Sequence, residues 1–189
     1  AALDHPNICA IYDVGSDGGV EYLVMPCIDG ERLDACLARG PLPIRDALDA
    51  AIQAADALDA AHRAGIVHRD IKPANVMVTE EGRGILMDFG IAGRSGGAEA
   101  GPAGFVVGTP GYMPPEQARG QRAGPPADVF SLGATLYDLL TGKEPFRGSS
   151  LFEVLRAIQE DEPVPPRRLD PRIDADLESK LITSRAADL

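Results

Sequence analysis

Short apolar runs punctuated by glycines dominate the first part of the chain. Residues 8–15 (ICAIYDVG) and 20–25 (VEYLVM) are rich in β-branched and aromatic side chains, and the segment between them supplies the glycines of a tight connection. This pattern predicts an antiparallel hairpin. A second pair of short apolar runs, residues 75–79 and 84–90, flanks the sequence EEGRG and predicts a second small hairpin.

Between the two hairpins, apolar residues recur at helical spacing. The face that they form contains Ile44, Leu48, Ala51, Ile52, Ala55, Leu58 and His62. Pro43 suits the first turn of a helix, and Gly65 suits a C-terminal stop. The pattern therefore predicts one long amphipathic helix.

The second half of the chain is predicted to be mainly helical. Residues 128–140 (DVFSLGATLYDLL) are mostly apolar, which indicates a helix buried on most sides. Residues 150–160 predict an amphipathic helix, and residues 174–182 predict a last helix after a proline-rich connection at 162–171. Residues 93–104 lack periodicity and predict a loop. Strands first and helices afterwards indicate the α+β class, with a small sheet portion and a larger helical body.

Composition and charge narrow the range of partners. The 189 residues are 44% hydrophobic and 25% charged, as in ordinary globular proteins. Lys and Arg number 18 and Asp and Glu 29, so the formal net charge is −11, which argues against nucleic acid and against contact with an anionic membrane. No apolar run reaches the roughly 18 residues of a membrane span. We expect a cytoplasmic chain, and a transmembrane segment elsewhere in the parent protein stays open.

The cysteines suggest no metal or disulfide framework. Cys9, Cys27 and Cys36 form no C-x-x-C pair and are odd in number. We expect them to be buried, reduced thiols.

One loop gathers most of the candidate chemistry. Residues 67–76 (VHRDIKPANV) contain Asp70, Lys72 and Asn75, and Asp88 ends the hairpin that follows. A loop held by regular elements on both sides can bring such side chains together on a ligand. Two carboxylates, an amide oxygen and an ammonium suit a magnesium-bound polyphosphate. Against this, each short motif also occurs by chance, and an Asp with a Lys two residues on is usually a solvated pair.

The order of four motifs makes chance a poor explanation. H-R-D-x-K-P-x-N at 68–75 precedes D-F-G at 88–90, GTPGYMPPE at 108–116 and DVFSLG at 128–133. Together they closely resemble the catalytic half of a protein kinase, most of all a bacterial serine/threonine kinase of the eukaryotic-like type. The resemblance extends from HPNI at 5–8 to the helix near residue 160.

The resemblance implies a protein-kinase-like fold, mainly the helical C-lobe with a remnant of the N-lobe sheet. Residues 1–25 would be the last N-lobe strands, residues 26–30 the hinge, and residues 31–189 a C-terminally incomplete C-lobe. The expected activity is transfer of the ATP γ-phosphoryl group to protein Ser or Thr hydroxyls, with ATP and Mg²⁺ as cofactors. Protein substrates are the expected partners, and a homodimer of the parent kinase is left open.

The resemblance also implies catalytic roles. Asp70 would accept the proton of the substrate hydroxyl or orient that hydroxyl, and Lys72 would steady the transferring phosphoryl group. Asn75 and Asp88 would hold the magnesium ions. Thr109 matches the family threonine that contacts the Asp and the Lys of the catalytic loop. Lys72 also favours Ser or Thr over Tyr as the acceptor.

On the adenine side, the resemblance places Met25 at the gatekeeper position and Met77 beneath the base. Pro26 occupies a hinge position where an acidic residue is common, and its missing N–H is not one that the nucleotide uses. The N–H of Ile28 is expected to bind the adenine.

Structural roles are implied for several other residues. His68 and Phe89 would stack in the internal spine of the family, and Asp128 would fasten the backbone of the catalytic loop. His5 and His62 are read as packed or hydrogen-bonded structural histidines.

Two features of the family are missing from this sequence. No G-x-G-x-x-G occurs before the hinge, and Lys72, Lys143 and Lys180 all follow it. Because every later motif is present, we expect a truncated kinase that is inactive by itself. A non-catalytic scaffold or binding module is the alternative, and a small-molecule kinase is disfavoured by GTPGYMPPE, which resembles a protein-substrate platform.

Overall fold

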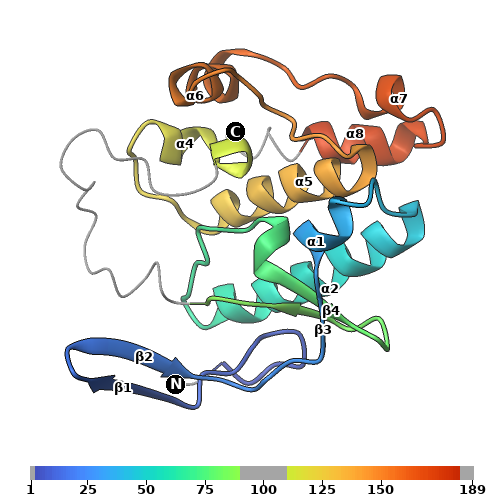
Figure 1. The fold of residues 1–189 in the computed structure, drawn as a ribbon. Helices are drawn as coiled ribbons and strands as arrows, with labels where there is room; N and C mark the ends of the chain where they lie inside the picture. The colour runs from blue at the N-terminus through green and yellow to red at the C-terminus, as the bar shows by residue number, and fades with distance from the viewer. Residues whose placement is uncertain (1–2, 90–109, 184–189) are drawn as a thin grey trace.

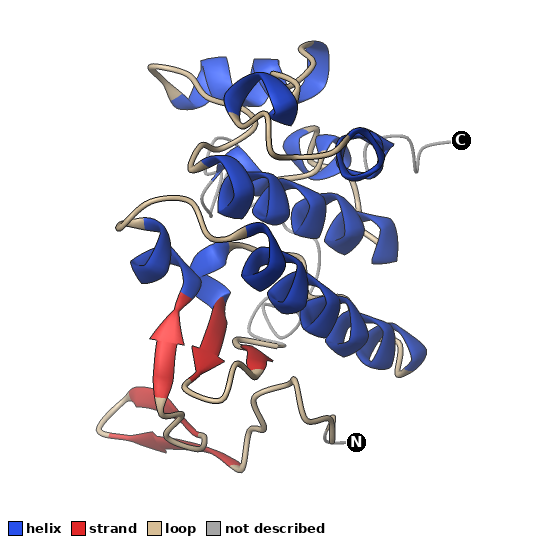
Figure 2. Ribbon diagram, turned by 90° about the vertical axis from the view of Figure 1, so that its right-hand side faces the viewer, coloured by secondary structure: helices blue, strands red, loops and turns tan. Residues whose placement is uncertain are grey.

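The computed structural model describes residues 3–89 and 110–183, with side chains to residue 181. Two small sheets lie at one end of the molecule and the helices stack above them (Figure 1 and Figure 2). The predicted α+β class is confirmed. The loop predicted at 93–104 lies outside the described residues.

The first predicted hairpin is present but shorter than its apolar pattern. Strands β1 (Asp13–Asp17) and β2 (Val20–Val24) pair antiparallel, with Asp17 opposite Val20. Gly18 and Gly19 alone form the turn, with φ angles of +56° and +83°. Two consecutive left-handed residues match the twist of a two-residue hairpin, and only glycine adopts them freely.

Residues 8 and 9 of the first predicted run are not part of the hairpin, because residues 7–9 pair with Leu86. The predicted run began at Ile8, but Ile8 instead forms a parallel bridge with Leu86. The hairpin itself is open to solvent, with exposed apolar side chains at Ile11, Tyr12, Val14, Val20, Tyr22 and Val24.

The second sheet contains the predicted second hairpin and one unpredicted strand. Strands β4 (Val76–Thr79) and β5 (Gly84–Leu86) pair antiparallel, as the sequence predicted. Strand β3 (Gly30–Arg32) adds to the other edge of β4. The three residues of β3 are not apolar, and only Leu33 next to them is, so no alternation of apolar and polar residues predicts this strand.

The long helix is confirmed as α2 (Ile44–Arg63), with Pro43 just before its first turn and Gly65 in the left-handed conformation after its end. Its predicted inward face is wrong in part, because Ile52 is 58% exposed and Ala55 is also exposed. The buried face consists of Ala47, Ala50, Ala54, Ala57, Leu58 and Ala61. Small side chains let α2 lie close to its neighbours.

Three further helices also match the predictions. Helix α5 (Pro125–Thr141) is largely buried, and its C-cap Gly142 has a φ angle of +67°. Helices α6 (Leu151–Glu160) and α8 (Ala175–Thr183) follow. The shorter elements are α1 (Leu33–Leu37), α4 (Pro115–Ala118), α7 (Pro166–Leu169) and the 3₁₀ turns Pro73–Asn75 and Pro110–Tyr112. Helix α7 lies inside the segment predicted as an irregular connection.

Two apolar cores organise these elements. The larger joins α2 and α5 to the second sheet, and it includes Leu33, Ile71, Leu86, Phe89, Leu139, Leu140 and Ile173. The smaller contains Tyr112, Met113, Phe130, Phe146, Val154 and Ile158. Since Ile71 and Phe89 flank the predicted catalytic residues, the larger core anchors both segments that carry the candidate chemistry.

The prediction for the cysteines is only partly confirmed. All three are free thiols, but only Cys9 is buried, whereas Cys27 is exposed and Cys36 is partly buried. Within residues 3–89 and 110–183, no helix combines the length and apolarity needed to cross a membrane.

We predict that replacing Ala57 by Leu lowers the free energy of unfolding by about 1–3 kcal/mol, because the added methyl groups overpack a fully buried site on α2. Urea unfolding followed by circular dichroism measures the change. Ile52→Ala on the exposed side of the same helix serves as the control and should shift stability by no more than about 0.5 kcal/mol. A larger loss for Ile52→Ala than for Ala57→Leu would contradict the observed face.

Candidate active site

The segment that carries most of the candidate chemistry runs from the end of α2 to the start of β4. Pro73 and Asn75 bound a single 3₁₀ turn, and the N–H of Asn75 donates to the carbonyl oxygen of Lys72 at 3.0 Å. The side chain of Ile71 is 1% exposed and fixes the middle of the segment in the larger core. The polar residues on either side of Ile71 are thereby held in place.

Asp70, Lys72 and Asn75 converge as the sequence predicted. The ammonium of Lys72 lies 2.7 Å from Oδ2 of Asp70. Nδ2 of Asn75 donates to the same Oδ2 at 3.0 Å and to the carbonyl oxygen of Asp70 at 2.7 Å. The Asp70 side chain is 44% exposed and the Lys72 side chain 18% exposed, so the carboxylate faces solvent while its partners lie deeper.

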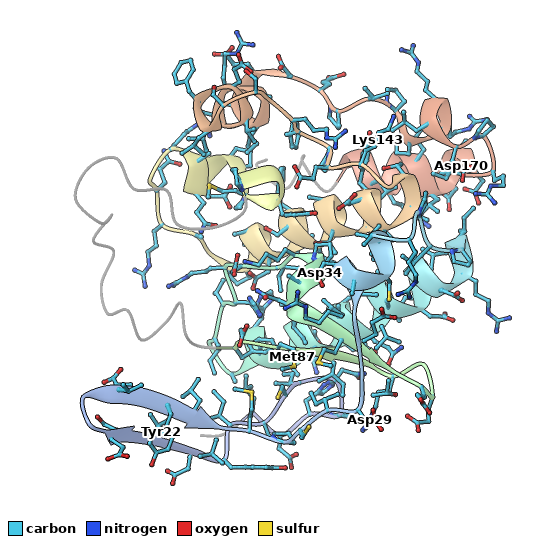
Figure 3. The ribbon with its side chains drawn as sticks, in the orientation of Figure 1. Tyr22, Asp29, Asp34, Met87, Lys143 and Asp170 are labelled. Atoms are coloured by element: carbon cyan, nitrogen blue, oxygen red, sulfur yellow. The ribbon has the colours of Figure 1, made fainter. Side chains whose placement is uncertain are left out.

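Asp88 reaches the same place through the register of the second sheet. Val76 is opposite Leu86, and the next pair is closed by the N–H of Met87, which donates to the carbonyl oxygen of Asn75 at 2.8 Å. Met87 lies where the strands meet the helical body (Figure 3). Asp88 is therefore the residue after Met87, whose backbone is hydrogen-bonded to that of Asn75.

Asp88 itself is strained. Its φ angle is +61°, in the left-handed region that non-glycine residues seldom occupy. Such a conformation persists only where the surroundings determine it, and it occurs most often at functional sites. The adjacent Phe89 is buried and contacts His68 as predicted, but the rings meet edge-on at 72° and are not stacked, with centroids 4.7 Å apart.

A buried carboxylate on α5 fastens the backbone ahead of Asp70. Oδ2 of Asp128 accepts from the N–H of His68 at 2.9 Å, and Oδ1 accepts from the N–H of Arg69 at 2.7 Å. Nε2–H of His62 donates to Oδ2 at 2.7 Å. Asp128 is 0% exposed, so these three bonds replace water around the carboxylate. The bonds from Asp128 to the N–H groups of His68 and Arg69 are those that its predicted fastening role requires. His62 is hydrogen-bonded, as predicted.

His68 links the two halves of the site. Its Nε2–H donates to the carbonyl oxygen of Met87 at 2.8 Å, and its Nδ1 accepts from the N–H of Asp70 at 3.3 Å. One buried imidazole therefore bonds the backbone of Asp70 and the backbone of Met87, the residue before Asp88.

Arg69 occupies an unusual position beside this link. Its φ angle is +67°, and its carbonyl oxygen accepts from Nε2 of Gln117 at 3.3 Å. Nε of Arg69 and Oε1 of Gln117 are buried with no hydrogen-bond partner in the described part of the chain.

Comparison with known proteins supports the resemblance that the order of the motifs suggested. The protein kinase domain model matches residues 1–182. This chain belongs to the protein kinase family. It is 39% identical over 192 residues to the serine/threonine-protein kinase PknB of Mycobacterium leprae, and 40% identical over 193 residues to the serine/threonine-protein kinase PknA of Mycobacterium tuberculosis. These alignments cover 98% of this chain but 31% and 45% of the two relatives, so the chain spans less than half of either.

The residues predicted on the adenine side of the kinase lie in two places. Met25, Pro26 and Ile28 belong to the connection between β2 and β3. Met77 lies on β4 opposite Arg32. Their contacts with a nucleotide remain predictions. Thr109 lies outside the described residues.

A polar cluster that the sequence pattern did not predict joins α5 to the segment that resembles the substrate platform. The hydroxyl of Tyr112 donates to Oδ2 of the buried Asp138 at 2.5 Å. Burial raises the pKa of Tyr112, and the Asp138 carboxylate raises it further. Burial also raises the pKa of Asp138, against the opposing effects of the Tyr112 hydrogen bond and of Arg147. The available signal was Asp138, an acid near the end of the apolar run of α5.

Glu144 completes this cluster. Burial raises its pKa, and the nearby Asp138 raises it further. Gly111 leaves room for it, since a Cβ atom at residue 111 would lie 2.6 Å from Oε2 of Glu144. The platform segment therefore rests on carboxylates that are partly withdrawn from water.

We predict that Asp128→Ala lowers the free energy of unfolding by about 1–3 kcal/mol for each backbone N–H that loses its only acceptor. The substitution removes the bonds to His68 and Arg69 from a fully buried site. Urea titration of Asp128→Ala against Asp56→Ala, an exposed position on α2, measures the difference. Equal unfolding midpoints for the two variants would contradict a fastening role.

We predict opposite pH dependences for two glutamates. The folded pKa of Glu144 lies above its ordinary value of 4.5, so its ionised form is disfavoured in the native state. Glu144→Gln should therefore gain stability relative to the wild type as pH rises from about 4.5 through the raised pKa. Hydrogen bonds from Ser149 lower the pKa of Glu153, so Glu153→Gln should lose relative stability as pH rises towards 4.5. Thermal unfolding between pH 3 and 8 tests both, and parallel curves would contradict the assignment.

Proposed function

We propose that the protein containing this chain is an ATP-dependent protein serine/threonine kinase. The two relatives named above are serine/threonine-protein kinases, and they support this activity for the whole protein. Residues 1–25 would belong to the N-lobe, residues 26–30 to the hinge and residues 31–189 to the C-lobe.

The observation that carries the proposal is the convergence of Asp70, Lys72 and Asn75 beside Asp88. Lys72 touches the carboxylate of Asp70 at 2.7 Å, and the backbone of Asn75 is bonded to the residue before Asp88. A phosphoryl group and an acceptor hydroxyl need a base, a cation and metal ligands within one small volume. The contacts among Asp70, Lys72 and Asn75, and the position of Asp88 after β5, support such a site.

Asp70 acts on the acceptor. Its side chain is 44% exposed, against 18% for Lys72, and its carboxylate accepts or orients the proton of the incoming Ser or Thr hydroxyl. Lys72 steadies the negative charge of the transferring group, and the ion pair with Asp70 holds the ammonium ready for it. The contact of Thr109 with both residues is part of the same proposal.

The donor chemistry of Asn75 and Asp88 fits magnesium. Both bonds that Asn75 makes to Asp70 come from Nδ2, which leaves the Oδ1 oxygen to bind a cation. Amide and carboxylate oxygens are the protein ligands that Mg²⁺ takes alongside substrate phosphates. Among the described residues, His, Cys, Asp and Glu form no group of three that could hold a metal. Bound Mg²⁺ would neutralise charge on the phosphate oxygens.

The adenine would bind on the other side of the cluster. Ile28 would offer its backbone N–H, Met77 would lie beneath the base, and Met25 would limit the depth of the site. Pro26 removes a donor from the hinge without removing the one that the nucleotide needs.

We predict that Asp70→Asn, in the full-length protein, lowers turnover by about 10²–10⁴-fold while the dissociation constant of magnesium ATP stays nearly unchanged. The carboxylate acts on the acceptor hydroxyl and not on the nucleotide. Asp88→Asn should weaken magnesium ATP binding as well. Radiolabelled phosphate transfer to a Ser/Thr protein and calorimetry with magnesium ATP measure the two effects.

The exposed Asp46→Asn on α2 is the matched control, and it should leave both quantities unchanged. Wild-type turnover in Asp70→Asn would refute the role of Asp70. A wild-type protein that binds magnesium ATP without transferring phosphate would favour the non-catalytic scaffold.

A further inference from the structure

The HPNI segment has a contact that neither its pattern nor the proposed catalytic roles explain. The carbonyl oxygen of Asn7 accepts from the N–H of Leu86 at 2.8 Å, and the carbonyl oxygen of Leu86 accepts from the N–H of Cys9 at 2.9 Å. Strand β5 therefore pairs with β4 on one edge and with residues 7–9 on the other.

Two side-chain amides bind the first residue of β5 from both sides. Nδ2 of Asn7 donates to the carbonyl oxygen of Gly84 at 2.7 Å and to Oε1 of Gln53 at 3.0 Å. The same Oε1 accepts from the N–H of Gly84 at 2.8 Å. We call this arrangement of Asn7, Gln53 and Gly84 the amide clamp.

The other end of the Gln53 amide ties the clamp to α2 and to the β4–β5 turn. Its Nε2 donates to the carbonyl oxygens of Gly82 at 3.0 Å and of Asp49 at 3.3 Å. One side chain thus joins a helix, a turn, a strand and the HPNI segment. A solvated surface glutamine would not use all of its hydrogen-bonding groups in this way.

The clamp acts on a strand that is very short. β5 has three residues, and only Met87 separates it from Asp88. At about 3.3 Å per residue, Gly84 lies roughly 13 Å from Asp88 along the strand. A displacement of the Gly84 backbone would therefore move Asp88 through the strand. It would also move Asn75, whose carbonyl oxygen accepts a hydrogen bond from the N–H of Met87.

We propose that the amide clamp positions Asp88 and Asn75 for magnesium nucleotide. The inference rests on the proposed function, and it makes Asn7 and Gln53 positioning residues that touch neither the metal nor the nucleotide. Asp88 needs such support because its left-handed backbone conformation holds only where the surrounding structure determines it.

The test replaces Gln53 by Met in the full-length protein, which keeps the length of the side chain and removes its hydrogen bonds. Calorimetry compares magnesium ATP with adenosine, which carries no phosphate. The affinity for magnesium ATP should fall about tenfold or more, as is typical when partners behind metal ligands are lost, and adenosine affinity should stay at the wild-type value. Gln159→Met on α6, where Nε2 bonds only the carbonyl oxygen of Leu155 at 3.0 Å among the described residues, is the matched control.

Two further measurements make the result specific. Asn7→Ala should produce the same selective loss, and the double variant with Gln53→Met should lose little more than either single variant, because both break one unit. Amide hydrogen exchange should accelerate at residues 84–87 in Gln53→Met but not in Gln159→Met. Asn7→Ala also carries the test if Gln53→Met does not fold.

Magnesium ATP affinity of Gln53→Met and Asn7→Ala equal to that of Gln159→Met would overturn the inference while the proposed function stands. Equal losses for adenosine and magnesium ATP would also overturn it, because they would show general loosening of the domain. A wild-type protein that binds neither ligand would instead overturn the proposed function, and the inference with it.

Discussion

The buried carboxylate of Asp128 joins helix α5 to helix α2 and to the backbone of residues 68 and 69. It accepts the N–H groups of His68 and Arg69 while His62 donates to it from α2. A charge with no exposed surface is tolerated only when hydrogen bonds replace its water. Two successive N–H groups point inward to meet this need, and Arg69, the second of the two residues, has a left-handed φ angle of +67°. The chain then leaves the turn with Asp70 facing solvent.

Backbone groups and the His68 ring connect this loop to strand β5. The His68 ring bonds the N–H of Asp70 and the carbonyl oxygen of Met87, and the Met87 N–H bonds Asn75. These contacts join the loop to the end of β5. Residues that would touch substrate are thus free to respond to it, since other residues maintain their placement.

Packing between helices gives this arrangement a rigid base. The buried face of α2 is made of alanines with one leucine, so α2 lies close to α5 and the carboxylate of one helix reaches the histidine of the other. Larger side chains on that face would separate the helices. Tyr112 packs in the smaller core, which is built mainly from large side chains such as Phe130 and Ile158.

The sequence by itself determined the class of fold, the long helices, both hairpins and the cluster of Asp70, Lys72 and Asn75. These depend on local periodicity or on residues close together in the chain, and the motif order pointed to the family. It did not determine which face of α2 is buried, because alanine is weakly apolar and Ile52 dominates the pattern. Tertiary structure alone decided the pairing of residues 7–9 with β5, the partners of Gln53 and the bond between Tyr112 and Asp138. Apart from the bond between Gln53 and Asp49, which are four positions apart, the residues of these contacts lie between 26 and 79 positions apart in the sequence, so no local pattern encodes them.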